Sequence, residues 1–222
     1  MAKFFVGLDL GQANDYTAVA VLEKLLPLPP APTKMEAQYH VRHLERVRNV
    51  PYPDVVKTVG DMMRSPALAG GTALVVDQTG VGAPVVDLFK LARLNPVSVL
   101  IHGGDSETGE KNSWRVPKRH LVGTMQVLFQ SGRLKISKKL PLASVLQAEL
   151  LNFKVKIDPQ TAHDSYSAWR EADHDDLVLS VALAAWFAES HAPKPLPRLV
   201  IPRGGDKVKP AWSLPSYVPG RF

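Results

Sequence analysis

The 222-residue chain contains no cysteine. Disulfide frameworks, thiol nucleophiles and cysteine-ligated zinc sites are therefore excluded. The chain also lacks an apolar run long enough to cross a bilayer, because the longest one, Leu177–Ala188, is short and is broken by Ser180. No signal-peptide pattern precedes the first strand-like segment, Phe4–Leu10. These absences predict a cytoplasmic protein with no membrane contact.

Proline and charge divide the chain into two parts. Hydrophobic residues make up 45% and charged residues 22% of the whole, a balance typical of a globular protein. Residues 191–222, however, contain seven prolines, six basic residues and one acid, without periodicity. We therefore expect one domain over residues 1–190 and a basic, Pro-rich C-terminal tail over 191–222 that is extended or disordered.

Apolar periodicity predicts an α/β domain. Strands are expected where short apolar, β-branched runs occur, and helices where apolar residues recur every three or four positions. The expected strands are 4–10, 16–23, 39–47, 72–76, 97–101, 133–136 and 154–157; the expected helices follow Pro53 and cover 81–93, 118–130, 142–152 and 175–189, with a loop at 103–116. The first three strands form an antiparallel meander and the later ones alternate with helices. This order indicates a mixed sheet with helices on both faces.

Four acidic residues lie within or at the ends of predicted buried elements. Asp9 lies between two leucines of the first strand, and Asp77 follows the strand 72–76. Asp175 and Asp176 open the last helix. An unpaired carboxylate in an apolar strand is costly, and converging carboxylates also repel one another. Mg²⁺ or Mn²⁺, which prefer oxygen ligands, would offset both costs, so the pattern predicts a metal site.

Three of these acids also have a simpler explanation. Asp175 and Asp176, together with Asp173, fit an N-cap and a first helical turn, where acids complement the helix dipole. Asp77 fits an Asx turn with the residues that follow it. Asp9 resists such an explanation, because a carboxylate between leucines inside a strand adds nothing to solubility. The combination of the four, rather than any one alone, favours a functional site.

Three segments that contain these acids resemble, in order and spacing, the nuclease domain of bacteriophage large terminases. They are Gly7–Gly11, Val75–Gly82 and His174–Ala184, and the resemblance covers about residues 1–190. It implies an RNase H-like fold of the α/β class. It also implies a DNA endonuclease, which would work in the host cytoplasm if a phage encodes it.

The resemblance implies two bound Mg²⁺ or Mn²⁺ ions. In that family, acids on the first strand, at the end of the fourth strand and at the start of the last helix hold the ions. Here these are Asp9, Asp77, and Asp175 or Asp176. Two ions about 3.5–4 Å apart would activate a water molecule and stabilise the leaving 3′-oxygen of a phosphodiester.

Two further residues complete the expected site. Asp15, in the turn after the first strand, matches an acidic position found in some members of the family. His174 is adjacent to the acids of the last helix, and we expect it to support them rather than to act as the base. The ions lower the pKa of the attacking water, so the reaction needs no histidine base.

Other functions share parts of this pattern. A Holliday-junction resolvase has the same fold and the closing acidic helix. An actin-like or sugar-kinase-like ATP-binding protein has the meander and a motif like Asp9-Leu10-Gly11, but it needs two such lobes and no second motif occurs. A non-catalytic binding module would tolerate the loss of Asp9. A packaging ATPase is not expected, because Gly104–Gly109 is followed by Glu110 rather than by the lysine of a phosphate-binding loop.

Basic residues concentrate in the middle of the chain. Residues 111–170 hold eleven Lys and Arg against three Asp and Glu, while the whole chain has a net charge of +6. Such a segment suits either DNA phosphates or a solvated surface. We expect double-stranded DNA as the partner, bound by Lys118, Arg119, Arg133, Lys135, Lys138, Lys139, Lys154 and Lys156. The resemblance adds a packaging ATPase, a small terminase or a portal protein as candidate partners.

Overall fold

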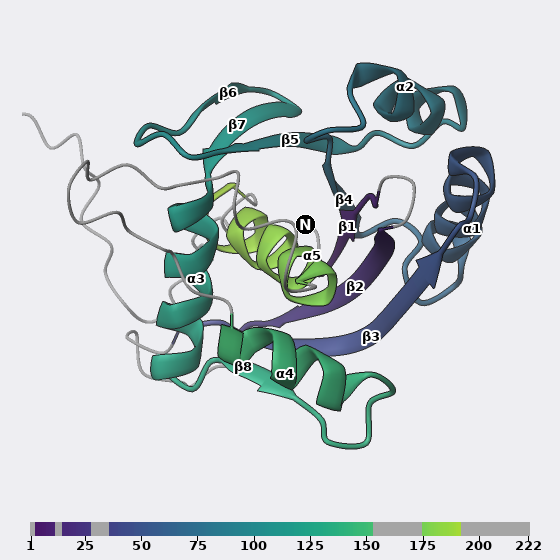
Figure 1. The fold of residues 1–222 in the computed structure, drawn as a ribbon. Coiled ribbons are helices and arrows are strands. Elements are labelled where there is room, and N and C mark those ends of the chain that lie inside the picture. Colours follow the sequence, from purple (N-terminus) through teal and green to yellow (C-terminus); the bar gives the residue numbers. More distant parts are fainter. Residues whose placement is uncertain (1–2, 12–14, 28–35, 153–174, 192–222) are drawn as a thin grey trace, which may run out of the picture.

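The computed structural model describes residues 3–11, 15–27, 36–152 and 175–191, which form one eight-stranded sheet with helices packed on it (Figure 1). Its strands are β1 (Phe4–Asp9), β2 (Tyr16–Leu25), β3 (Gln38–Arg48), β4 (Thr72–Asp77), β5 (Val97–His102), β6 (Thr108–Glu110), β7 (Ser113–Pro117) and β8 (Leu134–Ile136). The helices are α1 (Tyr52–Arg64), α2 (Ala83–Leu91), α3 (Lys118–Gln130), α4 (Ala143–Asn152) and α5 (Asp176–Trp186), with a π-helical turn, η1 (Phe187–His191).

The sheet has the mixed architecture that the sequence predicts. Its order is β6-β7-β5-β4-β1-β2-β3-β8. Strands β1, β2 and β3 form the expected antiparallel meander. Strands β4, β5 and β7 continue it in parallel, β8 pairs in parallel with β3, and β6 returns antiparallel to β7.

Side-chain alternation along β1 assigns one helical layer to each face. Val6, Leu8 and Leu10 join the core beneath α1 and α2. The side chain of Phe5 points to the opposite face and joins the core beneath α3, α4 and α5. Figure 1 shows the same division, with α5 lying across the sheet and α1 and α2 on its other side. Because alternate residues of a strand point to opposite faces, Gly7 and Asp9 belong to the α5 side.

Helix α5 is the most deeply buried element, as its nearly continuous apolar sequence predicts. All eleven of its residues are buried. It crosses β1 at Gly7, where an added Cβ would lie 1.8 Å from the carbonyl oxygen of Ser180. Only glycine permits this close approach. The helix ends at Trp186 rather than at the expected Glu189, because the last residues adopt the π-helical turn η1.

The expected loop at 103–116 is wrong in part. Strands β6 and β7 form a hairpin there, and β7 extends the sheet next to β5. Trp114 and Val116 are the only large apolar residues of that segment, so its strands depend on pairing with β5 rather than on a local pattern.

Other expectations lie outside the described residues. These are the strand at 154–157 and, apart from His191, the tail, so the domain boundary at residue 190 stays a prediction. No helix among the described residues is long and apolar enough to cross a membrane.

Candidate active site

The C-terminal ends of β1 and β4 bring Asp9 and Asp77 together. The two strands are parallel neighbours whose register ends with Leu8 opposite Val76, and the next residue of each strand is an aspartate. Val75 packs beneath α5, and alternation therefore directs Asp77, like Asp9, to that side of the sheet. Two carboxylates far apart in the chain thus share one edge and one face of the sheet.

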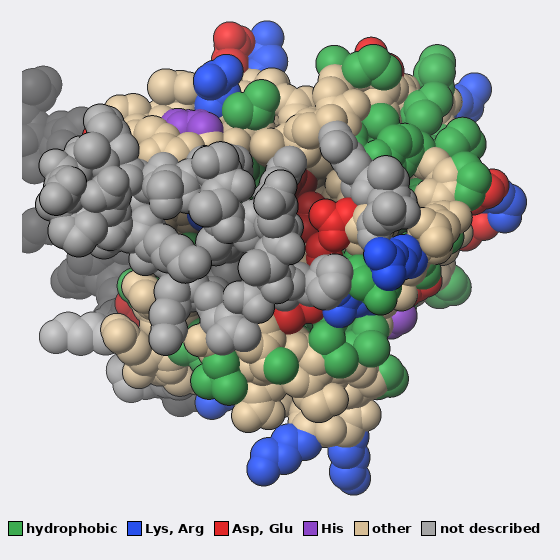
Figure 2. Space-filling model, in the orientation of Figure 1, with side chains coloured by type: hydrophobic (Ala, Val, Ile, Leu, Met, Phe, Trp, Pro, Cys, Tyr) green, Lys and Arg blue, Asp and Glu red, His purple; other side chains and the backbone are tan. Residues whose placement is uncertain are grey.

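Helix α5 brings its own acids to the same edge. Its crossing point on β1 is Ser180 over Gly7, and Asp176 lies one helical turn before Ser180. Asp175 occupies the N-cap position, immediately before the helix. Figure 2 shows acidic side chains gathered near the centre of this face, with basic side chains beside them. We refer to Asp9, Asp77, Asp175 and Asp176 as the acidic cluster.

Asp9 carries the strongest electrostatic signature of the cluster. It is half-buried, and it forms no hydrogen bond or ion pair with any residue that the structure describes. Burial raises the pKa of the Asp9 carboxyl well above its ordinary value, and repulsion by the rest of the cluster and by Asp15 raises the pKa further. Among the described residues, Asp9 therefore has no cation that would offset its charge.

Asp77 has a structural role as well as its place in the cluster. Its Oδ1 accepts a hydrogen bond from the backbone N–H of Thr79 at 2.7 Å, which is the Asx turn that the sequence suggests. The hydroxyl oxygen of Thr79 accepts the backbone N–H of Ile101 at 2.7 Å. The turn therefore fixes the end of β4 against β5 and orients the buried Asp77 side chain.

The two acids of α5 are in different surroundings. Asp175 makes no capping hydrogen bond to the helix, and the ammonium group of Lys118 lies 3.4 Å from its Oδ2. Burial raises the pKa of Asp175 even though Lys118 opposes this shift. Asp176 is 5% exposed and is bound by Arg46, whose Nη2 lies 2.7 Å from its Oδ2. The prediction of Asp175 as the N-cap residue is thus confirmed for its position, although its side chain does not cap the helix.

Glu149 supplies the cap that Asp175 does not, a role that sequence reasoning missed. Its Oε2 accepts the backbone N–H of Val178 at 2.9 Å, while its Oε1 lies 3.4 Å from Nη1 of Arg46. Burial raises the pKa of Glu149 to about 7, although the hydrogen bond from Val178 and the charge of Arg46 oppose the shift. Arg46 thus joins β3 to both α4 and α5.

Two arginines of β3 enclose an aromatic ring at the edge of the site. The guanidinium carbon of Arg46 lies 3.8 Å from the centre of the Tyr16 ring, and that of Arg48 lies 5.1 Å from it. A guanidinium over an aromatic face is attracted by the ring quadrupole. Arg46 is therefore held on one side by carboxylates and on another by Tyr16, whereas Arg48 is exposed.

The structure separates the expected DNA-binding residues into groups. Lys118 and Arg133 are already paired: Lys118 with Asp175, and Arg133 with Glu36 and Glu189, both at 2.8 Å. Arg119 pairs with Asp105. Lys135, Lys138 and Lys139 are exposed, whereas Lys154, Lys156 and His174 lie outside the described residues.

The exposed lysines are not all next to the acidic cluster. Lys135 pairs with His40, six positions before Arg46 on β3. That separation is about 20 Å along an extended strand. Lys138 and Lys139 follow β8, which runs parallel to β3 and hence toward the end of the sheet that carries the cluster.

The fit of the cluster to a metal rests on charge and donor chemistry. No three carboxyl or imidazole groups within the described part of the chain are grouped closely enough to hold a metal ion. The donors are nevertheless the hard oxygens that Mg²⁺ and Mn²⁺ prefer. The raised pKa values of Asp9 and Asp175 are those of carboxylates that a cation would stabilise. The residues present therefore suit a divalent ion.

Comparisons with known proteins support the fold. No protein-family model matches the chain, and no curated protein matches it. Among solved structures, the chain is similar to the large terminase nuclease from thermophilic phage G20c, with a TM-score of 0.53 and 19% identity over 84% of this chain and 81% of that one. It also aligns with RuvC of Thermus thermophilus at 12% identity, over 87% of this chain and 99% of that one, but the TM-score of 0.39 is too low to carry weight. The chain has the RNase H-like fold that its sequence predicts, and it shares this fold with a phage terminase nuclease.

Proposed function

We propose that this protein is a divalent-metal-dependent endodeoxyribonuclease. One observation carries the proposal: Asp9, half-buried and without a counter-charge among the described residues, lies at the same edge of the sheet as Asp77 and Asp175, whose charges raise its pKa. Strongly raised carboxyl pKa values in one cluster are typical of functional sites. The fold, which the chain shares with a terminase nuclease, supports the same function.

Asp9, Asp77 and Asp175 are the ligands that we assign to the metal. Asp176 is already engaged by Arg46 and is the most enclosed acid of the helix end, so we assign it to orienting α5. Asp15, exposed in the β1–β2 turn, adds negative charge at the rim. Two bound Mg²⁺ or Mn²⁺ ions would supply an activated water and stabilise the leaving 3′-oxygen.

The cations of the chain hold these acids in place. Lys118, at the start of α3, keeps a positive charge 3.4 Å from Asp175. Arg46 binds Asp176 and Glu149 together, so the first turn of α5 is fixed from two sides. Positioning of this kind keeps the carboxylates where a phosphodiester and a water molecule can meet.

Double-stranded DNA is the substrate that we propose. The exposed Lys135, Lys138 and Lys139 suit contacts with phosphates, which fix a duplex without reading its bases. Arg133 and Lys118 are left out of this contact set because carboxylates occupy them. The role in phage genome packaging, with an ATPase, a small terminase or a portal protein as partners, belongs to the same proposal.

Incubation with supercoiled plasmid tests the activity. Wild-type protein is expected to produce relaxed and linear DNA with Mn²⁺ or Mg²⁺, and no product with EDTA. Asp77→Asn should remove cutting under all conditions, because it removes one ligand while retaining the shape of the side chain. The change Asp87→Asn is the matched control, since Asp87 is exposed on α2 and forms an ion pair with Lys90, away from the acidic cluster.

Two results would contradict the proposal. One is cutting that EDTA does not reduce. The other is cutting that survives Asp77→Asn at the level of Asp87→Asn. Four-way junctions are included as a substrate, because preferential cutting of junctions over linear duplex would favour a resolvase.

A further inference from the structure

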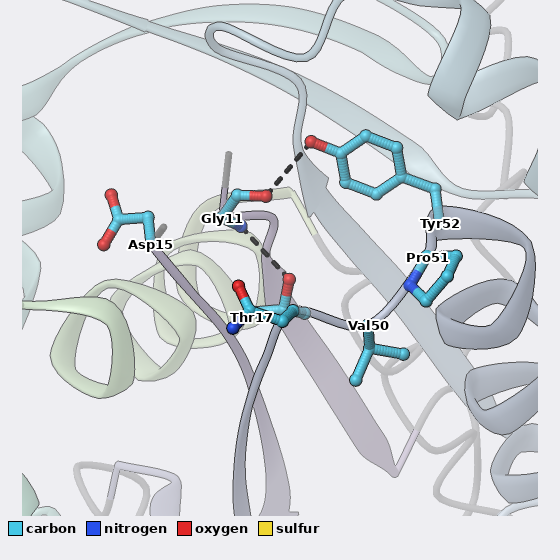
Figure 3. Close-up of a pocket in the computed structure, with 7 residues that line it drawn as sticks. Gly11, Asp15, Thr17, Val50, Pro51 and Tyr52 are labelled. Carbon is cyan, nitrogen blue, oxygen red and sulfur yellow. Dashed lines mark hydrogen bonds between the residues drawn. The ribbon is translucent and has the colours of Figure 1, made fainter. Parts of the chain in front are cut away.

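A small cavity lies beside the acidic cluster, between the β1–β2 turn and the start of α1 (Figure 3). It has a volume of about 270 Å³, slightly below the range of about 300–1,000 Å³ for drug-sized ligands. One ring system with its substituents would fill it. Its lining consists of Gly11, Asp15, Thr17, Asn49, Val50, Pro51 and Tyr52.

One hydrogen bond joins the two sides of the cavity, and a second one lies within its β1–β2 side. The phenol of Tyr52 donates to the carbonyl oxygen of Gly11 at 3.0 Å, which ties α1 to the β1–β2 turn. The backbone N–H of Gly11 donates to the hydroxyl oxygen of Thr17 at 3.2 Å. Both bonds are visible in Figure 3. Asn49, with a φ of 57°, turns the chain from β3 into the cavity wall.

The cavity is within one or two nucleotides of the acidic cluster. Gly11 follows Asp9 by two residues, a span of at most about 7 Å. Asp15 lines the cavity and also contributes to the raised pKa of Asp9. Successive nucleotides of a DNA strand advance by about 3.4 Å along the duplex. A strand whose phosphate lies at the cluster can therefore reach the mouth of this cavity.

The lining selects an uncharged, partly polar group. It contains one carboxylate, Asp15, and no Lys or Arg, so a phosphate inside would be repelled. Val50, Pro51 and the ring of Tyr52 form an apolar wall, while Thr17 and Asn49 offer a hydroxyl and an amide. A nucleobase with its sugar has this mixture of flat apolar surface and polar edges.

We propose that the cavity is a subsite for one nucleoside of the DNA strand, next to the phosphate that is cut. The inference rests on the proposed nuclease function. The base, turned out of the duplex stack, lies against Val50, Pro51 and Tyr52, and its phosphates stay outside, on the side of the exposed Arg48. The subsite fixes which phosphate of the strand reaches the acidic cluster.

An abasic scan tests the subsite. Cuts in an end-labelled duplex are mapped at nucleotide resolution with Mn²⁺, and single abasic sites are then placed at each position around the main cut. One position should lower the cutting rate by about tenfold, the typical loss of one base contact.

Val50→Trp fills the cavity from a side chain that is 37% exposed, so folding is retained. In this variant the same abasic site should have no further effect. Leu91→Trp, on an 80% exposed side chain of α2, is the matched control and should keep the wild-type pattern.

The outcomes separate the subsite from the nuclease. A flat abasic scan in an active wild-type protein, or a Val50→Trp pattern equal to that of Leu91→Trp, overturns the subsite and leaves the nuclease standing. If the wild-type protein does not cut DNA, the nuclease proposal fails. The affinity for each labelled abasic duplex is then measured by fluorescence anisotropy in EDTA. An abasic position that weakens binding to the wild-type protein but not to Val50→Trp supports the subsite. If no such position exists, the subsite is refuted.

Discussion

The two ends of the β1–β2 pair each hold a carboxylate, and the two behave in opposite ways. Glu23 pairs with Phe4 at the start of β1, whereas Asp9 ends the same strand. Glu23 is 6% exposed, with Lys3 at 2.6 Å and Arg42 at 2.7 Å from its oxygens. Burial alone would raise the pKa of Glu23, but hydrogen bonds from these two cations lower it. Burial and repulsion both raise the pKa of Asp9.

The difference indicates that Glu23 stabilises the fold, whereas Asp9 has the surroundings expected of a carboxylate that binds a ligand. A buried charge is stable when cations and hydrogen-bond donors surround it. Glu189 follows the pattern of Glu23, because Arg133 and the Tyr39 hydroxyl bind it and its pKa is lowered despite burial. Asp9 departs from this pattern. Natural proteins retain such uncompensated groups mainly where function requires them.

The largest expected effect comes from neutralising each of the two carboxylates in turn. Asp9→Asn should lower Mn²⁺-dependent cutting by more than about a thousandfold, or about 4 kcal/mol of activation free energy. The variant should be at least as stable as wild type in EDTA at pH 8, because it removes the repulsion between Asp9 and the other carboxylates of the cluster.

Glu23→Gln should have the opposite pair of effects. Its cutting rate should stay within a fewfold of wild type, and its free energy of unfolding should fall by about 1–3 kcal/mol. Cutting rates and urea denaturation measure both.

The comparison fails if the two variants exchange their effects. An Asp9→Asn protein that cuts DNA normally but unfolds more easily would make Asp9 a structural residue, and Glu23 would then need another explanation.

The next effect concerns two arginines on β3 that both bind buried carboxylates. Arg46→Ala leaves Glu149 and Asp176 without their shared cation and should lower the free energy of unfolding by about 3–5 kcal/mol. Arg42→Ala is the control: its side chain is 50% exposed and Glu23 keeps Lys3, so about 1 kcal/mol is expected. Urea denaturation at pH 7 measures both. Equal losses would show that Arg46 does not hold the end of α5.

The sequence predicted the elements whose signal is local. Alternation and apolar runs located β1 to β5, and the continuous apolar stretch located α5. Asp9 stood out because its own neighbours, Leu8 and Leu10, make a carboxylate costly there. Its convergence with Asp77 and the α5 acids was expected from the terminase resemblance and could not be derived from any one segment.

The sequence could not predict the partners of those acids. Arg46 lies in an alternating, half-exposed strand and Glu149 in an ordinary helical pattern, where both resemble surface residues. Their roles depend on the packing of β3, α4 and α5. The same reason explains Arg133: its local sequence is basic and suits DNA, but the fold places Glu189 beside it. Charge that is counted along a chain does not show which charges are already paired.

The pH dependence of stability tests Glu149. Its pKa is raised to about 7 in the folded protein from an ordinary value of 4.5. A raised carboxyl pKa contributes stability below the unfolded value, and this contribution is lost as the pH rises through the folded value. Between pH 5 and 8, Glu149 should therefore lower the free energy of unfolding by about 2–3 kcal/mol. Urea denaturation in EDTA at both pH values should show a smaller decline for Glu149→Gln. An identical decline in both proteins would contradict the assignment.

Divalent metal should stabilise the protein in a way that depends on Asp9. At a Mn²⁺ concentration tenfold above Kd, the gain is about 1.4 kcal/mol, which corresponds to an increase in Tm of about 3–6 °C for a chain of this size. The increase should be larger at pH 8 than at pH 5, because protons compete for Asp9, whose pKa is raised. Thermal melts should show the increase in Glu23→Gln and not in Asp9→Asn. An equal increase in both variants would place the metal elsewhere.

The smallest effect compares exposed with paired basic residues. Lys138 and Lys139 are exposed, so each phosphate that they contact adds about 0.9 to the slope of log affinity against log salt concentration. Changing both to alanine should lower that slope by up to about 1.8 without changing stability. Arg133→Lys should leave the slope unchanged and instead lower stability, because a lysine cannot make the two-pronged contact with Glu189 that Nη1 and Nη2 make. Anisotropy titrations across a range of salt concentrations, in EDTA, measure the slope. A slope that falls in Arg133→Lys and stays constant in the double lysine variant would mean that the ion pair with Glu189 opens when DNA binds.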